Sequence, residues 1–206
     1  MTDDFSPRRK PQQKRSRQTY ETIVAAATDL LVDEGYHNMS TNKIAEHADV
    51  SVGSIYQYFP NKEAIILAVI ERFAERQYDI LADGLEGLAR DDLRTVVRRV
   101  IDNMLEAKRD QPELSRVLFE QLPPMGQHDI LRDWTDRASE LITSALAERV
   151  DELRELDFEM ASYILVNACH GVVHGVVSTD QGPFDDAKLA EETTELVMRY
   201  LRPAES

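Results

Sequence analysis

The sequence predicts an all-α protein of about nine helices. Apolar residues recur at intervals of three and four along most of the 206-residue chain. No segment alternates apolar and polar residues with the period of two that is typical of a strand. Glycine and proline interrupt the pattern at Gly35, Pro112, 123–124 and 182–183, where helices should begin or end.

The composition fits one compact unit, or a small domain joined to a larger one, with 42% apolar residues. Cys169 is the only cysteine, so an intramolecular disulfide is impossible and we expect a reducing compartment, the cytoplasm. The basic N-terminus lacks the apolar core of a signal peptide. The longest apolar run, 64–70, is far too short to span a membrane.

Charge is distributed unevenly along the chain. The net charge is −14, yet residues 8–17 contain six basic residues and no acid. Residues 64–206 contain 16 basic and 29 acidic residues, a net charge of −13. A positively charged end favours contact with nucleic acid, although a basic tail without a partner is the alternative when the tail is considered alone.

The first 62 residues predict an arm, a helix and a closely spaced helix pair. Residues 1–16 are polar and predict a flexible arm. A single apolar stripe predicts a helix over about 17–34, which ends at Gly35. Residues 40–62 then contain two short helical patterns joined by a tight turn, which is typical of a helix-turn-helix that reads DNA.

Single residues within 40–62 support this interpretation. Val50 can fill the angle between the two helices, and the Ser51 hydroxyl can cap the second helix. Gly53 is unfavourable for a helix by propensity alone. It suits a position where the backbone itself must approach another molecule, such as a DNA backbone or a thymine methyl group.

The rest of the chain predicts six further helices. Asn61 caps a long helix whose first two turns, 64–70, are apolar on all sides and should be buried on all sides. The others are expected to start near Asp91 or Asp92 and at Pro112, and to cover about 129–150, 157–177 and 185–201. We therefore expect a basic arm at 1–16, a helix-turn-helix domain at 17–62 and a helical domain at 63–206.

The stretch from Arg17 to about Ile70 closely resembles the DNA-binding domain of TetR/AcrR-type transcriptional regulators. The most specific part is the run Gly-Ser-Ile-Tyr-Gln-Tyr-Phe-Pro-Asn-Lys-Glu at 53–63. Asp49 stands where the family most often has glycine, and Pro60 where it often has a polar or basic residue. The remaining two thirds match the family only in helix count and order.

The resemblance implies a homodimer that binds palindromic double-stranded operator DNA with two recognition helices in successive major grooves. It implies a C-terminal domain that binds a small-molecule effector and dimerises through the last two long helices, at about 157–177 and 185–201. We expect no cofactor, no metal, no membrane association and no enzymatic activity.

Transferred position by position, the resemblance implies a set of DNA contacts. The side chains suit different roles: Gln57 can pair with adenine, Val52 can meet a thymine methyl group, and hydroxyl or ammonium groups suit phosphates. Phe59 is expected in the core, and Arg8, Arg9 and Lys10 can reach a minor groove as flexible arms do. The expected contacts are Thr41, Asn42, Val52, Gly53, Ser54, Tyr56, Gln57, Tyr58 and Lys62.

A ligand pocket is expected among the fourth to eighth helices, with ordinary core packing as the alternative for each residue. Trp134 and Asn167 are the most informative candidates, because a buried indole N–H or amide needs a partner. The predicted lining residues are Phe73, Met104, Phe119, Trp134, Tyr163, Asn167 and His170.

The helix expected at 157–177 carries three further features. His170 and His174 share a helix face at a spacing that can hold a metal, but pocket or dimer packing is the favoured interpretation. Cys169 is interpreted as a packing residue. Ala161, Ala168, Gly171 and Gly175 allow close approach of another helix, in a dimer or within one subunit.

Together these observations predict a ligand-responsive transcriptional regulator, a repressor that leaves its operator when a small molecule binds. Three alternatives stay open: an activator of the same fold, a metal-binding enzyme that uses His170 and His174, and a protein-interaction module that has lost DNA binding. The sequence does not identify the effector, the operator or the regulated genes.

Overall fold

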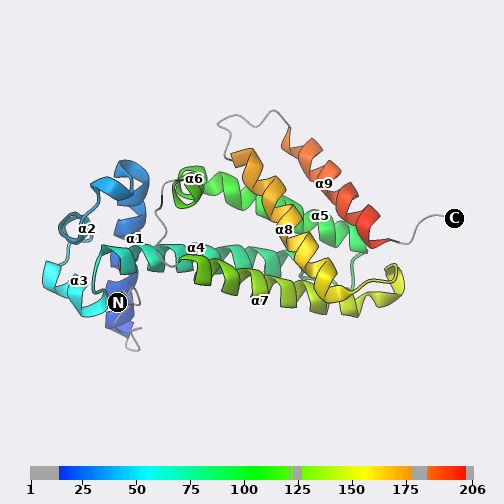
Figure 1. Cartoon of the computed structure of the whole chain (residues 1–206), viewed down its shortest axis with the longest axis horizontal. Coiled ribbons are helices and arrows are strands. Elements are labelled where there is room, and N and C mark those ends of the chain that lie inside the picture. The colour runs from blue at the N-terminus through cyan, green and yellow to red at the C-terminus, as the bar shows by residue number, and fades with distance from the viewer. Residues whose placement is uncertain (1–13, 121, 123–126, 178–184, 203–206) are drawn as a thin grey trace. The chain divides into compact units, whose positions relative to one another are not determined.

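The computed structural model describes residues 14–120, 122, 127–177 and 185–202, without the side chains of 119, 120, 127, 174, 176 and 177. Every regular element within these ranges is a helix, which confirms the all-α class (Figure 1). No helix among the described residues is both long and apolar enough to cross a membrane. The helices are α1 (Lys14–Glu34), α2 (Thr41–His47), α3 (Val52–Tyr58), α4 (Lys62–Gly84), α5 (Leu93–Asp110), α6 (Pro112–Glu120), α7 (Gln127–Glu148), α8 (Phe158–Val177) and α9 (Asp186–Leu201), with 3-10 turns at Tyr36–Asn38 and Val150–Glu152.

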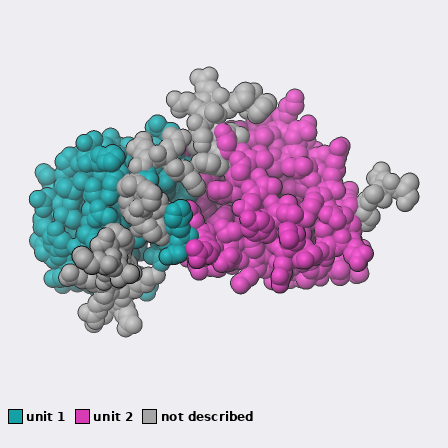
Figure 2. Space-filling model, viewed as in Figure 1, with its two compact units in different colours: residues 1–74, 113–130 teal, residues 75–112, 131–206 magenta. Residues whose placement is uncertain are grey.

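The chain forms two compact units, which Figure 2 shows in different colours. Unit 1 contains residues 1–74 and 113–130, and unit 2 contains residues 75–112 and 131–206. These units divide the chain differently from the predicted domain ranges, because the first half of α4 and the whole of 113–130 group with the N-terminal helices.

The core of unit 1 joins helices from both of its segments. Ile44 of α2, Ile55 of α3 and Phe59 are all fully buried. Six of the seven residues at 64–70 are also buried, as the apolar run predicted. From α6, Leu114 and Val117 complete the same cluster, so this helix packs with the N-terminal unit through contacts distant in sequence.

Helix starts are capped by the polar residues that the sequence places there. Asn61 accepts a hydrogen bond from the Ala64 N–H at 2.8 Å, as predicted for α4. Asp92 and Asp185 cap α5 and α9 in the same way. Each cap satisfies a backbone donor that has no partner inside the helix.

Unit 2 packs α5 against α8 and α9, and α4 ends against α5. At Gly84 a Cβ atom would lie 2.9 Å from the Val100 backbone, so only glycine permits this approach.

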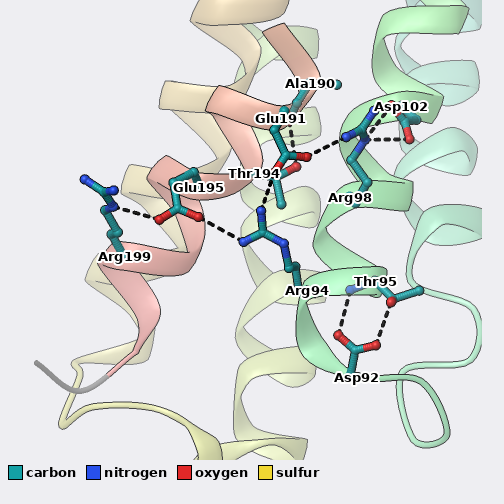
Figure 3. A network of polar contacts seen from close by, with 10 residues as sticks. All are labelled: Asp92, Arg94, Thr95, Arg98, Asp102, Ala190, Glu191, Thr194, Glu195 and Arg199. Atoms are coloured by element: carbon teal, nitrogen blue, oxygen red, sulfur yellow. Dashed lines mark hydrogen bonds and ion pairs between the residues drawn. The ribbon is translucent and has the colours of Figure 1, made fainter. Parts of the chain in front are cut away.

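On the solvent side, arginines of α5 pair with acids of α9 (Figure 3). Arg94 bonds Glu195 at 2.9 Å and also pairs with Glu191, which Arg98 contacts at 2.9 Å. Because these ion pairs are exposed to solvent, each adds little to the stability of the fold.

Candidate DNA-binding surface and ligand cavity

The turn between α2 and α3 ends α2 with a defined hydrogen-bond pattern. The Val50 N–H bonds the Ala45 carbonyl at 3.0 Å, and the Asp49 N–H bonds the Glu46 carbonyl at 3.2 Å. This is a Schellman motif, whose C′ residue must adopt a left-handed conformation. Asp49 does so, with φ of 51°, which explains why glycine is common at this position in the family that the sequence resembles.

Both helices of the pair begin with a serine cap. The Ser40 and Ser51 hydroxyls accept backbone N–H bonds from Lys43 and Ser54, at 3.3 and 3.0 Å. Ser51 was predicted as the cap of α3, and the structure confirms it. The caps fix where α3 begins and therefore which of its side chains face outward.

One face of α3 is buried and the other is exposed. Ile55 is fully buried, while Gly53, Tyr56 and Gln57 are exposed. Val52 and Ser54 are half-buried at the edges of the exposed face. Gln57 therefore presents its amide to solvent, the geometry that bidentate pairing with a base requires.

Tyr56 and Thr41 bring two hydroxyl groups together from different helices. Tyr56 is 44% exposed, and its hydroxyl lies 3.4 Å from the Thr41 hydroxyl at the start of α2. Asn42, the next residue, is exposed. Hydroxyl groups paired in this way can contact one phosphate and set the register of α3 on DNA.

Tyr58 differs from the other predicted contacts because its ring is half-buried. It meets the Tyr20 ring edge-on at 6.3 Å, and its hydroxyl lies 3.1 Å from the Ser16 hydroxyl. This contact brings the first turn of α1 to the end of α3, so the exposed basic residues Arg15 and Arg17 lie close to this end of α3. Arg8, Arg9 and Lys10, predicted to reach a minor groove, lie outside the described residues.

Lys62 points inward. Its ammonium group donates to the Tyr36 carbonyl at 3.1 Å and to the Met39 carbonyl at 3.4 Å, and it lies 3.9 Å from the centre of the Tyr36 ring. These contacts connect the start of α4 to the link between α1 and α2. A phosphate contact by Lys62 would have to share or replace them.

Gly53 has open space where a side chain would be. A Cβ atom at this position would meet only the Ser51 hydroxyl, at 3.7 Å, which is an ordinary contact. Packing within the chain therefore does not require glycine here. The absence of a side chain matters only to a molecule that approaches α3 from outside.

A cavity lies in unit 2, among α4, α5, α7, α8 and α9. Its empty space, including the open mouth, is about 890 Å³. Three of the predicted ligand residues line it: Met104, Trp134 and His170. The other described lining residues, none of which was predicted to line the cavity, are Gln77, Leu81, Leu85, Leu88, Leu93, Val96, Val97, Val100, Ile101, Ile142, Ala145, Leu146, Leu165, Val166, Cys169, Val197 and Leu201.

Three predicted ligand residues lie away from the cavity, and the fourth, Phe119, has no described side chain. Phe73 packs against the core of unit 1. Tyr163 and Asn167 are exposed on α8, on the face opposite to the one that lines the cavity. The Asn167 amide donates to the Tyr163 carbonyl at 2.8 Å, so this polar group has a partner without a ligand. The side chain of Phe119 lies outside the described residues.

Four described side chains of the cavity wall carry a polar group: Gln77, Trp134, Cys169 and His170. Trp134 is the most informative of them. Its indole N–H is buried and finds no acceptor among the described residues. The His170 ring lies 5.4 Å from the indole ring, between centroids. Cys169, also in the wall, is desolvated, which raises the pKa of its thiol to about 11 and leaves it unreactive near neutral pH.

The outer face of α8 carries a stripe of exposed apolar and small residues, which the polar Asn167 interrupts. Met160, Tyr163 and Ile164 are 58%, 58% and 40% exposed, and Leu196 of α9 is 56% exposed beside them. A Cβ at Gly171 would have nothing within 4 Å. Because Gly171 leaves this part of the surface without a side chain, another helix can approach it closely.

The metal interpretation gains no support from the described residues. No group of three His, Cys, Asp or Glu residues among them could hold a metal ion. The side chain of His174, the proposed partner of His170, lies outside the described residues.

A capped helix-turn-helix with an exposed polar face, together with an apolar cavity in a second helical unit, defines the class of DNA-binding transcriptional regulators. A family model described as "Bacterial regulatory proteins, tetR family" matches residues 23–69. A second, "Tetracyclin repressor-like, C-terminal domain", matches residues 92–201. The chain belongs to the TetR family of transcriptional regulators.

Individual relatives agree with this assignment over nearly the whole chain. The fatty acid metabolism regulator protein of Bacillus subtilis is 25% identical over 201 residues, 90% of this chain and 96% of that protein. The structure of the fatty acid degradation regulator FadR from Bacillus halodurans has a TM-score of 0.71 at 22% identity and covers 92% of this chain and 97% of its own. NalD, a secondary repressor of the MexAB-OprM multidrug efflux pump in Pseudomonas aeruginosa, has a TM-score of 0.67 at 21% identity, covering 91% and 99%.

Proposed function

We propose that this protein is a homodimeric repressor that binds a palindromic operator and leaves it when a small apolar molecule enters the cavity of unit 2. The observation that carries the proposal is the continuity of α4. Residues 64–70 of this helix are part of the unit 1 core, whereas Gln77 and Leu81 of the same helix line the cavity. In this proposal a change in the cavity wall reaches the DNA-binding helices along α4, because this one helix contributes residues to both.

The size of the effect follows from helix geometry. Lys62 and Leu81 are separated by roughly 28 Å along α4, at about 1.5 Å per residue. A tilt of about 10° at Leu81 displaces the start of α4 by roughly 5 Å. In a dimer the recognition helices of both protomers move, and these helices must stay about 34 Å apart to enter successive major grooves. A ligand produces this shift only if it binds the displaced state more tightly than the DNA-bound state.

DNA recognition is assigned to the exposed residues of α2 and α3. In this proposal Gln57 reads a base, Val52 contacts a thymine methyl group, and Thr41 and Tyr56 hold one phosphate. Further contacts on the same surface are assigned to Asn42, Ser54, Tyr58 and Lys62. Gly53 has no side chain and so allows α3 to approach the DNA closely.

Operator recognition can be tested on duplex DNA selected from a random library by repeated binding. The double variant Gln57→Ala with Tyr56→Ala is expected to lose specific binding in a gel shift at fixed salt, while its oligomeric state stays unchanged. Glu140→Ala, an exposed change on α7, is the control and should bind like the wild type. Unchanged operator affinity in the double variant would refute the residue assignment.

Dimerisation is assigned to the exposed stripe of α8 and the neighbouring Leu196. We expect Ile164→Glu and Leu196→Glu to place charges in the interface and yield monomers in analytical ultracentrifugation, because an unpaired buried carboxylate is costly. Leu131→Glu, which alters an exposed leucine of α7, serves as the control. A dimer that persists in both interface variants would contradict this assignment.

The relative from Bacillus subtilis is named for fatty acid metabolism. Together with the apolar cavity, this supports an effector with a hydrocarbon chain. Release from the selected operator by such molecules, followed by fluorescence anisotropy of labelled DNA, tests the response, and DNA that stays bound at saturating ligand would exclude it.

A further inference from the structure

The lining of the cavity restricts the charge of its ligand. None of the 20 described lining residues is Asp, Glu, Lys or Arg. An ionised group that entered this wall would lose its hydration and would meet no permanent opposite charge, because His170 is the one lining side chain that can become cationic and an imidazole is mostly neutral at pH 7. The cavity therefore favours uncharged molecules and disfavours a free carboxylate, even on a hydrocarbon chain that fits.

One donor in this apolar wall lacks a partner within the described structure. The indole N–H of Trp134 is buried and has no acceptor among the residues that the structure describes, and an indole N–H can only donate. A buried donor without an acceptor carries a desolvation penalty that a suitable ligand atom removes. The Trp134 N–H therefore favours a ligand that carries a hydrogen-bond acceptor, such as an ester, ketone or amide oxygen.

We propose that the effector is an uncharged molecule with a hydrocarbon body and one carbonyl-type acceptor, and that this acceptor binds the N–H of Trp134. The inference rests on the proposed function only in calling this ligand the effector. Trp134 is then the residue that determines specificity, and the leucine and valine side chains around it supply affinity without selecting for polar groups.

Three probe molecules distinguish the effect of ligand charge on affinity from the effect of a hydrogen bond to Trp134. Methyl octanoate carries the acceptor without charge, octanoate carries a charge, and 1-chlorodecane has the same number of heavy atoms as the ester but a poor acceptor. Their affinities are measured by displacement of the neutral fluorophore N-phenyl-1-naphthylamine, without DNA. For the wild type, emission of Trp134, the only tryptophan in the chain, gives a second and direct readout.

Two variants identify the hydrogen bond. Trp134→Phe keeps an aromatic ring but removes the N–H, so it should weaken the ester by about 3- to 10-fold relative to the chloroalkane. Met104→Leu alters another lining residue but removes no hydrogen-bond donor. It should therefore change the affinities for the ester and for the chloroalkane equally. Circular dichroism of both variants verifies that they fold.

The expected result is ester binding clearly tighter than octanoate, with a preference for the ester over the chloroalkane that falls only in Trp134→Phe. Octanoate that binds as tightly as the ester overturns the uncharged class. An equal loss for both neutral probes in Trp134→Phe overturns the hydrogen bond, and no binding of any probe overturns the whole inference. If the predicted pattern holds but the ester does not release operator DNA, the proposed function fails and the cavity's specificity stands.

Discussion

Replacement of Gly53 by alanine separates the stability of the fold from the approach to DNA. Within the protein the substitution has no steric cost, because the added Cβ meets only the Ser51 hydroxyl, at 3.7 Å. Alanine exceeds glycine in helix propensity by about 0.8–1.0 kcal/mol in a helix interior. Because Gly53 is the second residue of α3, we expect roughly 0.5 kcal/mol of stabilisation and a Tm higher by about 1–2 °C.

DNA binding should change in the opposite direction. A methyl group at the face of closest approach separates α3 from DNA, and several contacts along the helix weaken together. We expect at least a tenfold loss of operator affinity, or about 1.4 kcal/mol, at fixed salt. The assays are differential scanning calorimetry for the free protein and fluorescence anisotropy with labelled operator for the complex.

Gly84→Ala is the matched control. Its Cβ would meet the Val100 backbone at 2.9 Å in unit 2, so this variant should lose about 1–3 kcal/mol of stability. Because Gly84 ends α4, this variant is a control for stability alone. The reasoning fails if Gly53→Ala binds operator as tightly as the wild type, or if Gly53→Ala is the less stable of the two variants.

Further predictions concern the turn and a buried tyrosine. Asp49→Gly relieves the left-handed strain at φ 51° and should stabilise unit 1 by about 0.5–1 kcal/mol in calorimetry, whereas Asp49→Val should destabilise it by more than 1 kcal/mol; a stabilised valine variant would exclude strain as the cause. Burial, followed by the hydrogen bond to Glu63, raises the pKa of Tyr36 from 10.0 to about 12. Because the fold favours the neutral phenol, this contribution to stability is complete below pH 10.0 and is lost as the pH rises through about 12. An ultraviolet titration of Tyr36→Phe should lack one late-ionising tyrosine, and an unchanged curve would contradict the assignment.

Local features of the chain were predictable because they depend on neighbours in sequence. The caps at Ser51, Asn61 and Asp92 follow from side chains that reach a backbone N–H three residues away. The apolar run at 64–70 predicted a helix segment buried on all sides, and the structure confirms it. The all-α class and the TetR family were also evident, since short-range pattern and motif carry both.

The cavity was predicted only in part, because periodicity identifies an apolar face but not what that face meets. On α8, alternate faces line the cavity and the exposed stripe, so Tyr163 and Asn167 could not be separated from Val166 and His170 by spacing alone. Twelve of the 20 described lining residues are leucine or valine, which resemble ordinary core residues in a sequence.

The sequence by itself determined that the chain is helical, where its capped helices start, and that a DNA-reading helix pair stands near its N-terminus; α1 begins at Lys14, three residues before the predicted start. Tertiary structure alone decided that Lys62 turns inward to backbone carbonyls and that α6 packs with the N-terminal helices. It also decided that Trp134 lines an apolar cavity and that its N–H has no acceptor within the described part of the chain. The physical reason is distance along the chain. Helix caps and turns depend on atoms within a few residues, whereas the environment of a side chain depends on elements that the sequence places far away.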